Sequence, residues 1–173
     1  KTLPKNVFDQ EYLARFIDTG GEVFSNLDGC TVDQWPQARG KIYCGIDLAK
    51  QEDYTVATFM DADGKVIEIY RANAQEWSTM TRNILDLIRK HQATVTIEVN
   101  SIGDVIYEMI AKEWQDTHPF QTTSKSKTEI IEGLILDVNE ANIQIPSKGL
   151  WPYLYDELTV FTYDYNPKTR SIK

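Results

Sequence analysis

The pattern of apolar and polar positions changes near residue 41. Before that point, one short helical pattern is followed by a polar stretch that reaches Trp35-Pro36. The helical pattern spaces its apolar residues three and four apart: Phe8, Tyr12, Leu13 and Phe16. We therefore predict that residues 1–40 form an N-terminal arm or linker and that residues 41–173 form a folded domain.

Three segments after residue 41 carry strand patterns. KIYCGIDLA, YTVATFM and KVIEIYRA are short and rich in apolar and β-branched residues. The last two flank Asp61-Ala62-Asp63-Gly64, a sequence typical of a hairpin turn. The domain is therefore expected to begin with three antiparallel strands.

Helices and strands alternate in the rest of the chain. An amphipathic helix is expected over residues 76–90, followed by a buried strand at TVTIEVN. Ser101 can cap a second helix, and His118–Thr122 is a plausible fifth strand. After a polar turn at TSKSK come two further helices, the second over Trp151–Val160, and then two extended segments around Asn166-Pro167.

The order β-β-β-α-β-α-β-α predicts an α/β fold built on one mixed sheet. A strand that is reached through a crossover helix normally pairs in parallel with a right-handed connection. Three antiparallel strands followed by parallel strands, with flanking helices, is the ribonuclease H-like order.

Asp47 is a carboxylate inside an otherwise apolar strand. Strand alternation places it on one face with Tyr43 and Gly45, and Gly45 leaves room there for a ligand or another backbone. Burying an ionised group costs several kcal/mol unless the group is paired or bound to a metal. An Asp at a strand end is also a common turn cap, so GIDLA alone is a weak signal.

Glu98 repeats this situation at the end of TVTIEV, whose apolar character predicts a central strand. If the two strands are neighbours, the carboxylates of Asp47 and Glu98 stand about 5 Å apart, where like charges repel unless a cation lies between them. Glu98 as a simple cap of the helix near Ser101 is the alternative. A metal pair explains both residues together.

The residue types favour a hard cation. Mg²⁺, and likewise Mn²⁺, prefers carboxylate, water and phosphate oxygens. In a two-metal hydrolysis one ion lowers the pKa of the attacking water and the other stabilises the departing 3′ oxygen, and Asp47 is the best candidate to bridge both ions. Asp53 is a secondary candidate ligand or a turn residue, and Lys125 and Lys127 are weak candidates for DNA contacts.

Charge and composition restrict how the protein meets its partners. The formal net charge of −8 and the pI near 4.8 argue against nucleic-acid binding through a broad basic surface. Bound divalent cations would supply positive charge locally. No signal peptide or membrane-length apolar run is visible, so we expect a cytosolic protein, and we expect Cys30 and Cys44 to be reduced.

Two segments together resemble the nuclease domain of tailed-phage terminase large subunits: GIDLAKQEDYTVA and, about fifty residues later, VTIEVNSIGDVIYEMI. FDQEYLARFIDTGGEVF resembles the passage that joins the packaging ATPase to the nuclease in that family. KSKTEIIEGLILDVNEANIQIP resembles a later helix followed by a short apolar strand. The resemblance covers most of the chain.

The resemblance implies that Asp47 and Glu98 bind divalent metal for cutting concatemeric viral DNA. It implies double-stranded DNA as substrate, a packaging ATPase domain in the same polypeptide, a small terminase subunit and a portal as partners, and the bacterial host cytoplasm as location. It also places a third acidic residue after the C-terminal hairpin, so we expect Lys173 to precede the completing ligand. Asp137, Asp156 and Glu157 are poor substitutes on polar helix faces.

Two other functions compete with this interpretation. GIDLA also resembles the first phosphate strand of sugar kinases and chaperone-type ATPases, but KQEDY is not their Gly- and Thr-rich turn, and no G-x-x-x-x-G-K-[ST] loop is present. A non-catalytic docking module for DNA or a protein partner, with the same fold, is the second alternative. Metal-dependent cleavage would separate it from a nuclease.

Overall fold

The computed structural model describes residues 23–48, 53–99, 103–161, 165–166 and 171–172. The helical pattern at Phe8 to Phe16 and the Ser101 cap lie outside these residues. The chain forms two compact units, Trp35–Thr122 and Lys1–Gln34 together with Thr123–Lys173. The division into residues 1–40 and 41–173 stays a prediction.

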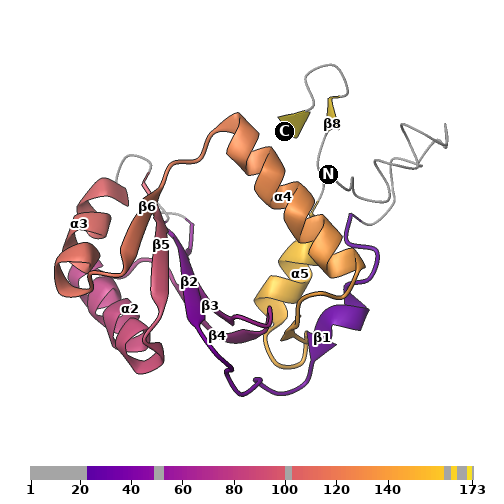
Figure 1. Ribbon diagram of the computed structural model, residues 1–173, viewed down its shortest axis with the longest axis horizontal. Coiled ribbons are helices and arrows are strands. Elements are labelled where there is room, and N and C mark those ends of the chain that lie inside the picture. Colours follow the sequence, from indigo (N-terminus) through magenta and orange to yellow (C-terminus); the bar gives the residue numbers. More distant parts are fainter. Residues whose placement is uncertain (1–22, 49–52, 100–102, 162–164, 167–170, 173) are drawn as a thin grey trace. The chain divides into compact units, whose positions relative to one another are not determined.

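The Trp35–Thr122 unit is built on a five-stranded mixed sheet of order β4-β3-β2-β5-β6 (Figure 1). Its strands are β2 (Ile42–Asp47), β3 (Thr55–Asp61), β4 (Val66–Ala72), β5 (Thr94–Glu98) and β6 (Thr117–Phe120). The first three pair antiparallel, whereas β5 pairs in parallel with β2 and with β6. This arrangement confirms the predicted ribonuclease H-like mixed sheet.

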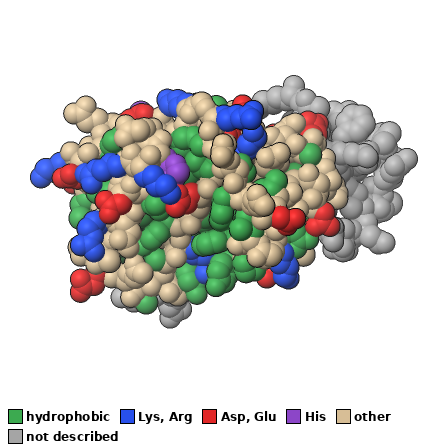
Figure 2. Space-filling model, turned by 90° about the horizontal axis from the view of Figure 1, so that it is seen from below, with side chains coloured by type: hydrophobic (Ala, Val, Ile, Leu, Met, Phe, Trp, Pro, Cys, Tyr) green, Lys and Arg blue, Asp and Glu red, His purple; other side chains and the backbone are tan. Residues whose placement is uncertain are grey.

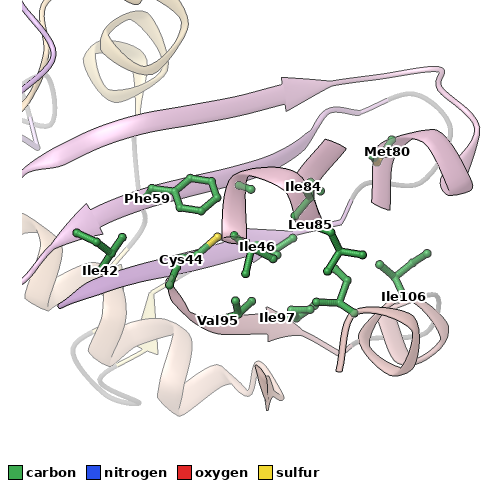
Figure 3. Close-up of a cluster of buried hydrophobic side chains, with 14 of the residues drawn as sticks. Ile42, Cys44, Ile46, Phe59, Met80, Ile84, Leu85, Val95, Ile97 and Ile106 are labelled. Carbon is green, nitrogen blue, oxygen red and sulfur yellow. The ribbon is translucent and has the colours of Figure 1, made fainter. Parts of the chain in front are cut away.

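Helices α2 (Trp77–His91) and α3 (Gly103–Glu113) lie together on one face of this sheet. Ile84 and Leu85 of α2 meet alternate strand residues, among them Cys44 and Ile97 (Figure 3). All four side chains are buried, and burial of each apolar side chain contributes roughly 1.5–3 kcal/mol. The core therefore fixes which side of each strand faces the helices.

The intervening residues of β2 and β5 point away from this core. Tyr43, Gly45, Asp47 and Thr96 are all exposed, as strand alternation requires. We call the side that carries them the exposed face of β2 and β5. The predicted grouping of Asp47 with Tyr43 and Gly45 is therefore confirmed.

Asp61 closes the hairpin between β3 and β4. Its side chain is 2% exposed and accepts hydrogen bonds of 3.0 Å from the backbone N–H groups of Arg39, Asp63 and Lys65. Gly64 supplies the positive φ of 80° that the turn needs. The turn predicted at residues 61–64 is thus present, with Asp61 as its organising side chain.

The other unit contains α4 (Ser124–Asn139), α5 (Pro152–Val160) and a parallel pair of two-residue strands, β1 (Thr31–Val32) and β7 (Ile145–Pro146). A 3-10 turn, η1 (Asp28–Cys30), precedes β1, and β8 (Tyr165–Asn166) pairs antiparallel with β9 (Ser171–Ile172). Cys30 is buried, and its thiol donates to the Val138 carbonyl at 3.1 Å. Segments far apart in the sequence are therefore packed into one unit.

The polar turn predicted at TSKSK is wrong, because α4 begins there. The Thr123 hydroxyl accepts from the Ser126 backbone N–H, and the Ser126 hydroxyl accepts from the Thr123 backbone N–H. This reciprocal capping box satisfies two donors at the helix start. Ser and Thr favour both turns and helix caps, which explains the error.

Cys30 and Cys44 are free and buried, as predicted. Burial raises the pKa of the Cys44 thiol to about 12, which keeps it protonated and unreactive at neutral pH. Among the described segments, no helix has the length and apolar character to cross a membrane.

Candidate metal-binding site on the exposed face of the sheet

Asp47 and Glu98 end two adjacent parallel strands. Ile46 pairs with Ile97 in the β2–β5 register, so the next residues, Asp47 and Glu98, stand side by side. Both project to the exposed face, because the residues before them face the core. The sheet therefore brings the two predicted carboxylates together at the carboxyl ends of two inner strands, although they are 51 residues apart in the sequence.

The two side chains are close enough for one to affect the other's ionisation. The pKa of Asp47 is raised, first by partial burial, then by the negative charge of Glu98, and by a hydrogen bond between the two side chains. A hydrogen bond from the Leu48 backbone N–H acts in the opposite direction. Asp47 remains exposed and Glu98 is half-buried, so both stay accessible to a ligand from solvent.

Asp53 adds a third acidic group near this pair. It lies just before β3 and is exposed, and its charge also raises the pKa of Asp47. Within the residues that the structure describes, no three His, Cys, Asp or Glu side chains are arranged to hold a metal ion. The site as described is thus a carboxylate pair with one further acidic neighbour.

Gly45 leaves the space beside the pair open. A Cβ atom built on this glycine meets no other atom within 4 Å. The glycine is therefore not required for packing within the protein. Together with the exposure of Asp47, it leaves room on this face for a cation, water and a phosphate group.

The sequence analysis did not single out Arg71 and Tyr54, which lie at the same end of the sheet as the carboxylate pair. Asp47 pairs with Val56 across the β2–β3 register, and Val56 pairs with Arg71 across the β3–β4 register. The Arg71 guanidinium carbon lies 3.3 Å from the centroid of the Tyr54 ring. The β3–β4 register shifts between Phe59 and Met60, so counting along the sequence from the hairpin turn does not place Arg71 in this row.

Lys125 and Lys127 lie in the first turn of α4, both exposed. The Lys125 ammonium is 4.0 Å from the Glu129 carboxylate, one helical turn away. These lysines belong to the unit that contains Thr123–Lys173, whereas Asp47 and Glu98 belong to the Trp35–Thr122 unit. Their part in DNA contacts stays a prediction.

The two histidines have structural partners. His91 Nε2 lies 2.6 Å from the Glu68 carboxylate, and His118 Nε2 lies 2.9 Å from that of Asp116. Asp156, a poor substitute for the third acidic ligand, is 2.7 Å from the Lys148 ammonium. These contacts account for His91, His118 and Asp156 without catalytic roles.

No protein-family model matches the sequence, and no curated protein matches it. Among solved structures, the large terminase nuclease from thermophilic phage G20c with bound magnesium is similar, with a TM-score of 0.72 and 22% identity over 89% of this chain and 88% of that one. The Thermus phage P74-26 large terminase nuclease domain gives 0.68 and 22% over 86% and 82% of the two chains. The nuclease domain of the large terminase subunit gp2 of bacterial virus Sf6 gives 0.62 and 9% over 91% and 88%. The chain therefore has the fold of large terminase nuclease domains.

Proposed function

We propose that this chain, which has the fold of the large terminase nucleases, is a divalent-metal-dependent DNA endonuclease that cuts concatemeric viral DNA during genome packaging. The observation that carries the proposal is the contact between Asp47 and Glu98 at the ends of neighbouring strands. Two like charges held together on an accessible face are explained by a cation between them.

The chemistry of these side chains fits Mg²⁺ or Mn²⁺. Both cations favour carboxylate oxygens and retain coordination places for water and phosphate. The open space at Gly45 accommodates such ligands. The similar large terminase nuclease from thermophilic phage G20c was solved with magnesium, zinc and cobalt bound, which supports a divalent-cation site on this fold.

When bound, one or two such cations supply the positive charge that activates water and stabilises the departing 3′ oxygen. The chain's own contribution is to position the ligands. Asp47 is held by the sheet and by the Leu48 backbone N–H, and Glu98 by the parallel register beside it. Ligands on rigid strands keep their spacing as DNA binds, which favours a defined site of attack.

Recognition of DNA depends on more than this chain's surface charge. Acidic and basic side chains are interspersed on the face drawn in Figure 2, and the net charge is −8. Phosphate binding through a broad basic surface is therefore not favoured. We include in the proposal a packaging ATPase domain of the same polypeptide, a small terminase subunit and a portal, which would bring DNA to the site in the host cytoplasm.

Supercoiled plasmid tests the nuclease proposal directly. The chain with Mn²⁺ or Mg²⁺ is expected to convert plasmid to nicked and linear forms, and chelation with EDTA should stop the reaction. Asp47→Asn and Glu98→Gln should reduce the rate at least about a hundredfold while leaving the fold intact. Glu108→Gln, which neutralises an exposed acid of α3, is the matched control and should cleave normally.

A non-catalytic docking module is the second candidate function. It is favoured by the lack, within the described segments, of a cluster of three metal-ligating side chains. That function predicts metal-independent binding to DNA or a partner and no cleavage in any divalent cation. Cleavage that persists in the Asp47→Asn protein would reject the proposed site.

A further inference from the structure

Tyr43 is a large aromatic side chain on the exposed face of β2 and β5. It is 47% exposed, although its neighbours Ile42 and Cys44 are buried in the core. Strand alternation puts its ring on the side of the sheet away from α2 and α3 (Figure 1). Packing of the core therefore does not account for an aromatic residue at this position.

Lys41 brings a positive charge to this ring. Its ammonium lies 5.4 Å from the centroid of the Tyr43 ring, within the range of a cation–π interaction, and its side chain is exposed. The two residues are neighbours on the same side of the chain, because Ile42 between them faces the core. An exposed ring and an exposed cation therefore stand together in a chain of net charge −8.

The acidic residue of this neighbourhood already has other partners. The charge of Asp116 acts on Lys41, but the Thr94 hydroxyl donates to one oxygen of Asp116 at 2.6 Å, and His118 Nε2 lies 2.9 Å from the other. Among the described residues, the Lys41 ammonium thus contacts the Tyr43 ring, while Asp116 is engaged across β5 and β6. The cation stays accessible to an anion from solvent.

The surface between the ring and the carboxylate pair carries only small side chains. Gly45 follows Tyr43 on this face and pairs with Thr96 of β5, and both are exposed. A Cβ atom built on Gly45 meets no other atom within 4 Å, so the sheet is open here. A flat, open sheet surface with an exposed ring and a nearby cation is the kind of surface on which single-stranded nucleic acids stack their bases.

Tyr43 lies within reach of a DNA strand bound at the carboxylate pair. It is four residues from Asp47 on β2, or roughly 13 Å at the usual rise along a strand. That distance covers at most about four nucleotides, because one strand carries a phosphate every 3.4 Å or so along a stacked helix and extends further when unstacked. One short stretch of DNA can therefore occupy both places.

We propose that Tyr43 stacks on an unpaired nucleobase of the DNA strand that is bound at the carboxylate pair, and that Lys41 contacts the phosphate beside this base. The inference rests on the proposed nuclease function and deepens it by naming the substrate, DNA that is locally unpaired near the cut. A base that is still paired is covered by its neighbours in the stack and does not reach the ring.

The test compares binding of a short oligothymidine strand and of a duplex of equal length by the full chain and its variants, with Ca²⁺ in place of Mg²⁺. Tyr43→Leu keeps an apolar side chain but removes the flat ring, and it should raise the Kd for the single strand about tenfold, as expected for one lost base–aromatic stack. Tyr43→Phe keeps the ring and should bind like the wild type. Duplex binding should be the same in all three proteins.

Salt dependence separates the phosphate contact from the stack. Lys41→Ala should lower the slope of log K against log salt by about 0.7, the value for one phosphate contact on a single strand, whereas Tyr43→Leu should leave the slope nearly unchanged. Lys112→Ala and Met109→Ala are the matched controls, because both side chains are exposed on α3, which covers the other face of the sheet. Neither control should alter binding.

Cleavage gives a second readout of the same contact. With Mn²⁺, the wild type should cut a duplex that contains a short unpaired bubble faster than a fully paired duplex of the same sequence. Tyr43→Leu should lose most of this preference, chiefly through a higher KM for the bubble substrate, because the ring binds the substrate and takes no part in the chemical step.

Equal affinity of the wild type and folded Tyr43→Leu for the single strand would overturn the proposal, even if the wild type cleaves plasmid. Equal losses on the single strand and the duplex would overturn it as well, because the contact would then not be base stacking. A wild-type chain that cleaves nothing, yet binds the single strand through Tyr43, would reject the nuclease function and retain the stacking site. A wild-type chain that cleaves plasmid but does not bind the single strand would do the reverse.

Discussion

Asp47 and Glu98 lie side by side at the carboxyl ends of two parallel strands, where the negative charge of Glu98 raises the pKa of Asp47. Partial burial and the negative charges of Glu98 and Asp53 raise the pKa of Asp47, whereas the hydrogen bond from the Leu48 backbone N–H lowers it. Asp61, in contrast, is surrounded by three backbone N–H donors. The hydrogen bonds to Asp61 thus stabilise a turn, whereas the surroundings of Asp47 disfavour its ionised form.

Removing a charge from the carboxylate pair should stabilise the metal-free protein. Asp47→Asn is expected to raise the free energy of unfolding at pH 7 by about 0.2–1 kcal/mol, the range for like charges opposed across strands. The pKa of Asp47 in the folded protein is raised above its ordinary 3.8, so the native state binds more protons than the unfolded state at pH values between the two pKa values. The stability of the wild type therefore falls as the pH rises through this range.

Urea unfolding in EDTA between pH 4 and pH 7 measures this effect. The advantage of Asp47→Asn should shrink as the pH falls, because a growing share of the wild-type acid is then protonated. Glu108→Gln, an exposed change on α3, should show no such dependence. A destabilised Asp47→Asn protein at pH 7 without metal would mean that the carboxylate stabilises the fold.

Asp61→Asn should destabilise the protein by about 2–3 kcal/mol, because an amide nitrogen would face one of the backbone donors now bound by a carboxylate oxygen. Burial acts to raise the pKa of Asp61, but hydrogen bonds from Lys65, Arg39 and Asp63 dominate and lower it. Its stabilisation is present above the ordinary pKa of 3.8 and is lost as pH falls through the lowered folded value.

Asp63→Asn, two residues away, is the matched control for this turn. Asp63 is exposed and pairs with Lys65 at 3.5 Å, so its loss should cost less than about 0.5 kcal/mol. Chemical denaturation of both variants at pH 7 measures the contrast. Equal stabilities would show that the hydrogen bonds to Asp61 contribute little.

Asp53→Asn should weaken Mn²⁺ binding by no more than about fivefold, the range for a solvent-screened charge. The reason is that Asp53 acts on Asp47 through its charge and lies exposed at the edge of the site. Calorimetric titration measures it, with Asp86→Asn on α2 as control. Complete loss of binding would make Asp53 an essential ligand, and an affinity equal to that of the control would remove it from the site.

Thr123→Ala should cost about 1 kcal/mol of unfolding free energy, because it removes the hydroxyl that caps α4. Ser124→Ala, at the next position, is expected to cost much less, because the hydrogen bond from the Thr128 hydroxyl goes to the Ser124 backbone carbonyl and survives the change. Urea denaturation compares the two. Equal effects would contradict the assignment of Thr123 as the cap.

Much of the sheet was predictable because local signals agree with its tertiary structure. Ile42, Cys44 and Ile46 alternate with polar or small residues, and the hairpin turn fixes the direction of the next strand. Asp47 and Glu98 were recognisable because each interrupts or ends an apolar strand. Their contact depended on one further step, the parallel pairing of β2 with β5.

Features that depend on distant pairing were not predictable from local pattern. Arg71 and Tyr54 look like ordinary strand residues until the register across three strands is known. The β1–β7 pair joins Thr31 to Ile145 through only two residues on each strand, too short for a sequence pattern. A third metal ligand is still a prediction, because no such residue joins Asp47 and Glu98 among the described segments.

Mn²⁺ titration of the wild-type chain and Asp47→Asn tests most directly whether the carboxylate pair is a cation site. We predict saturable binding by the wild type and a melting temperature that rises with Mn²⁺, since a ligand that prefers the folded state stabilises it. Asp47→Asn should be the more stable protein in EDTA, bind Mn²⁺ at least about tenfold more weakly, and lose its advantage when the ion is added. Equal Mn²⁺ affinity in the two proteins would contradict the assignment of Asp47 to a metal site.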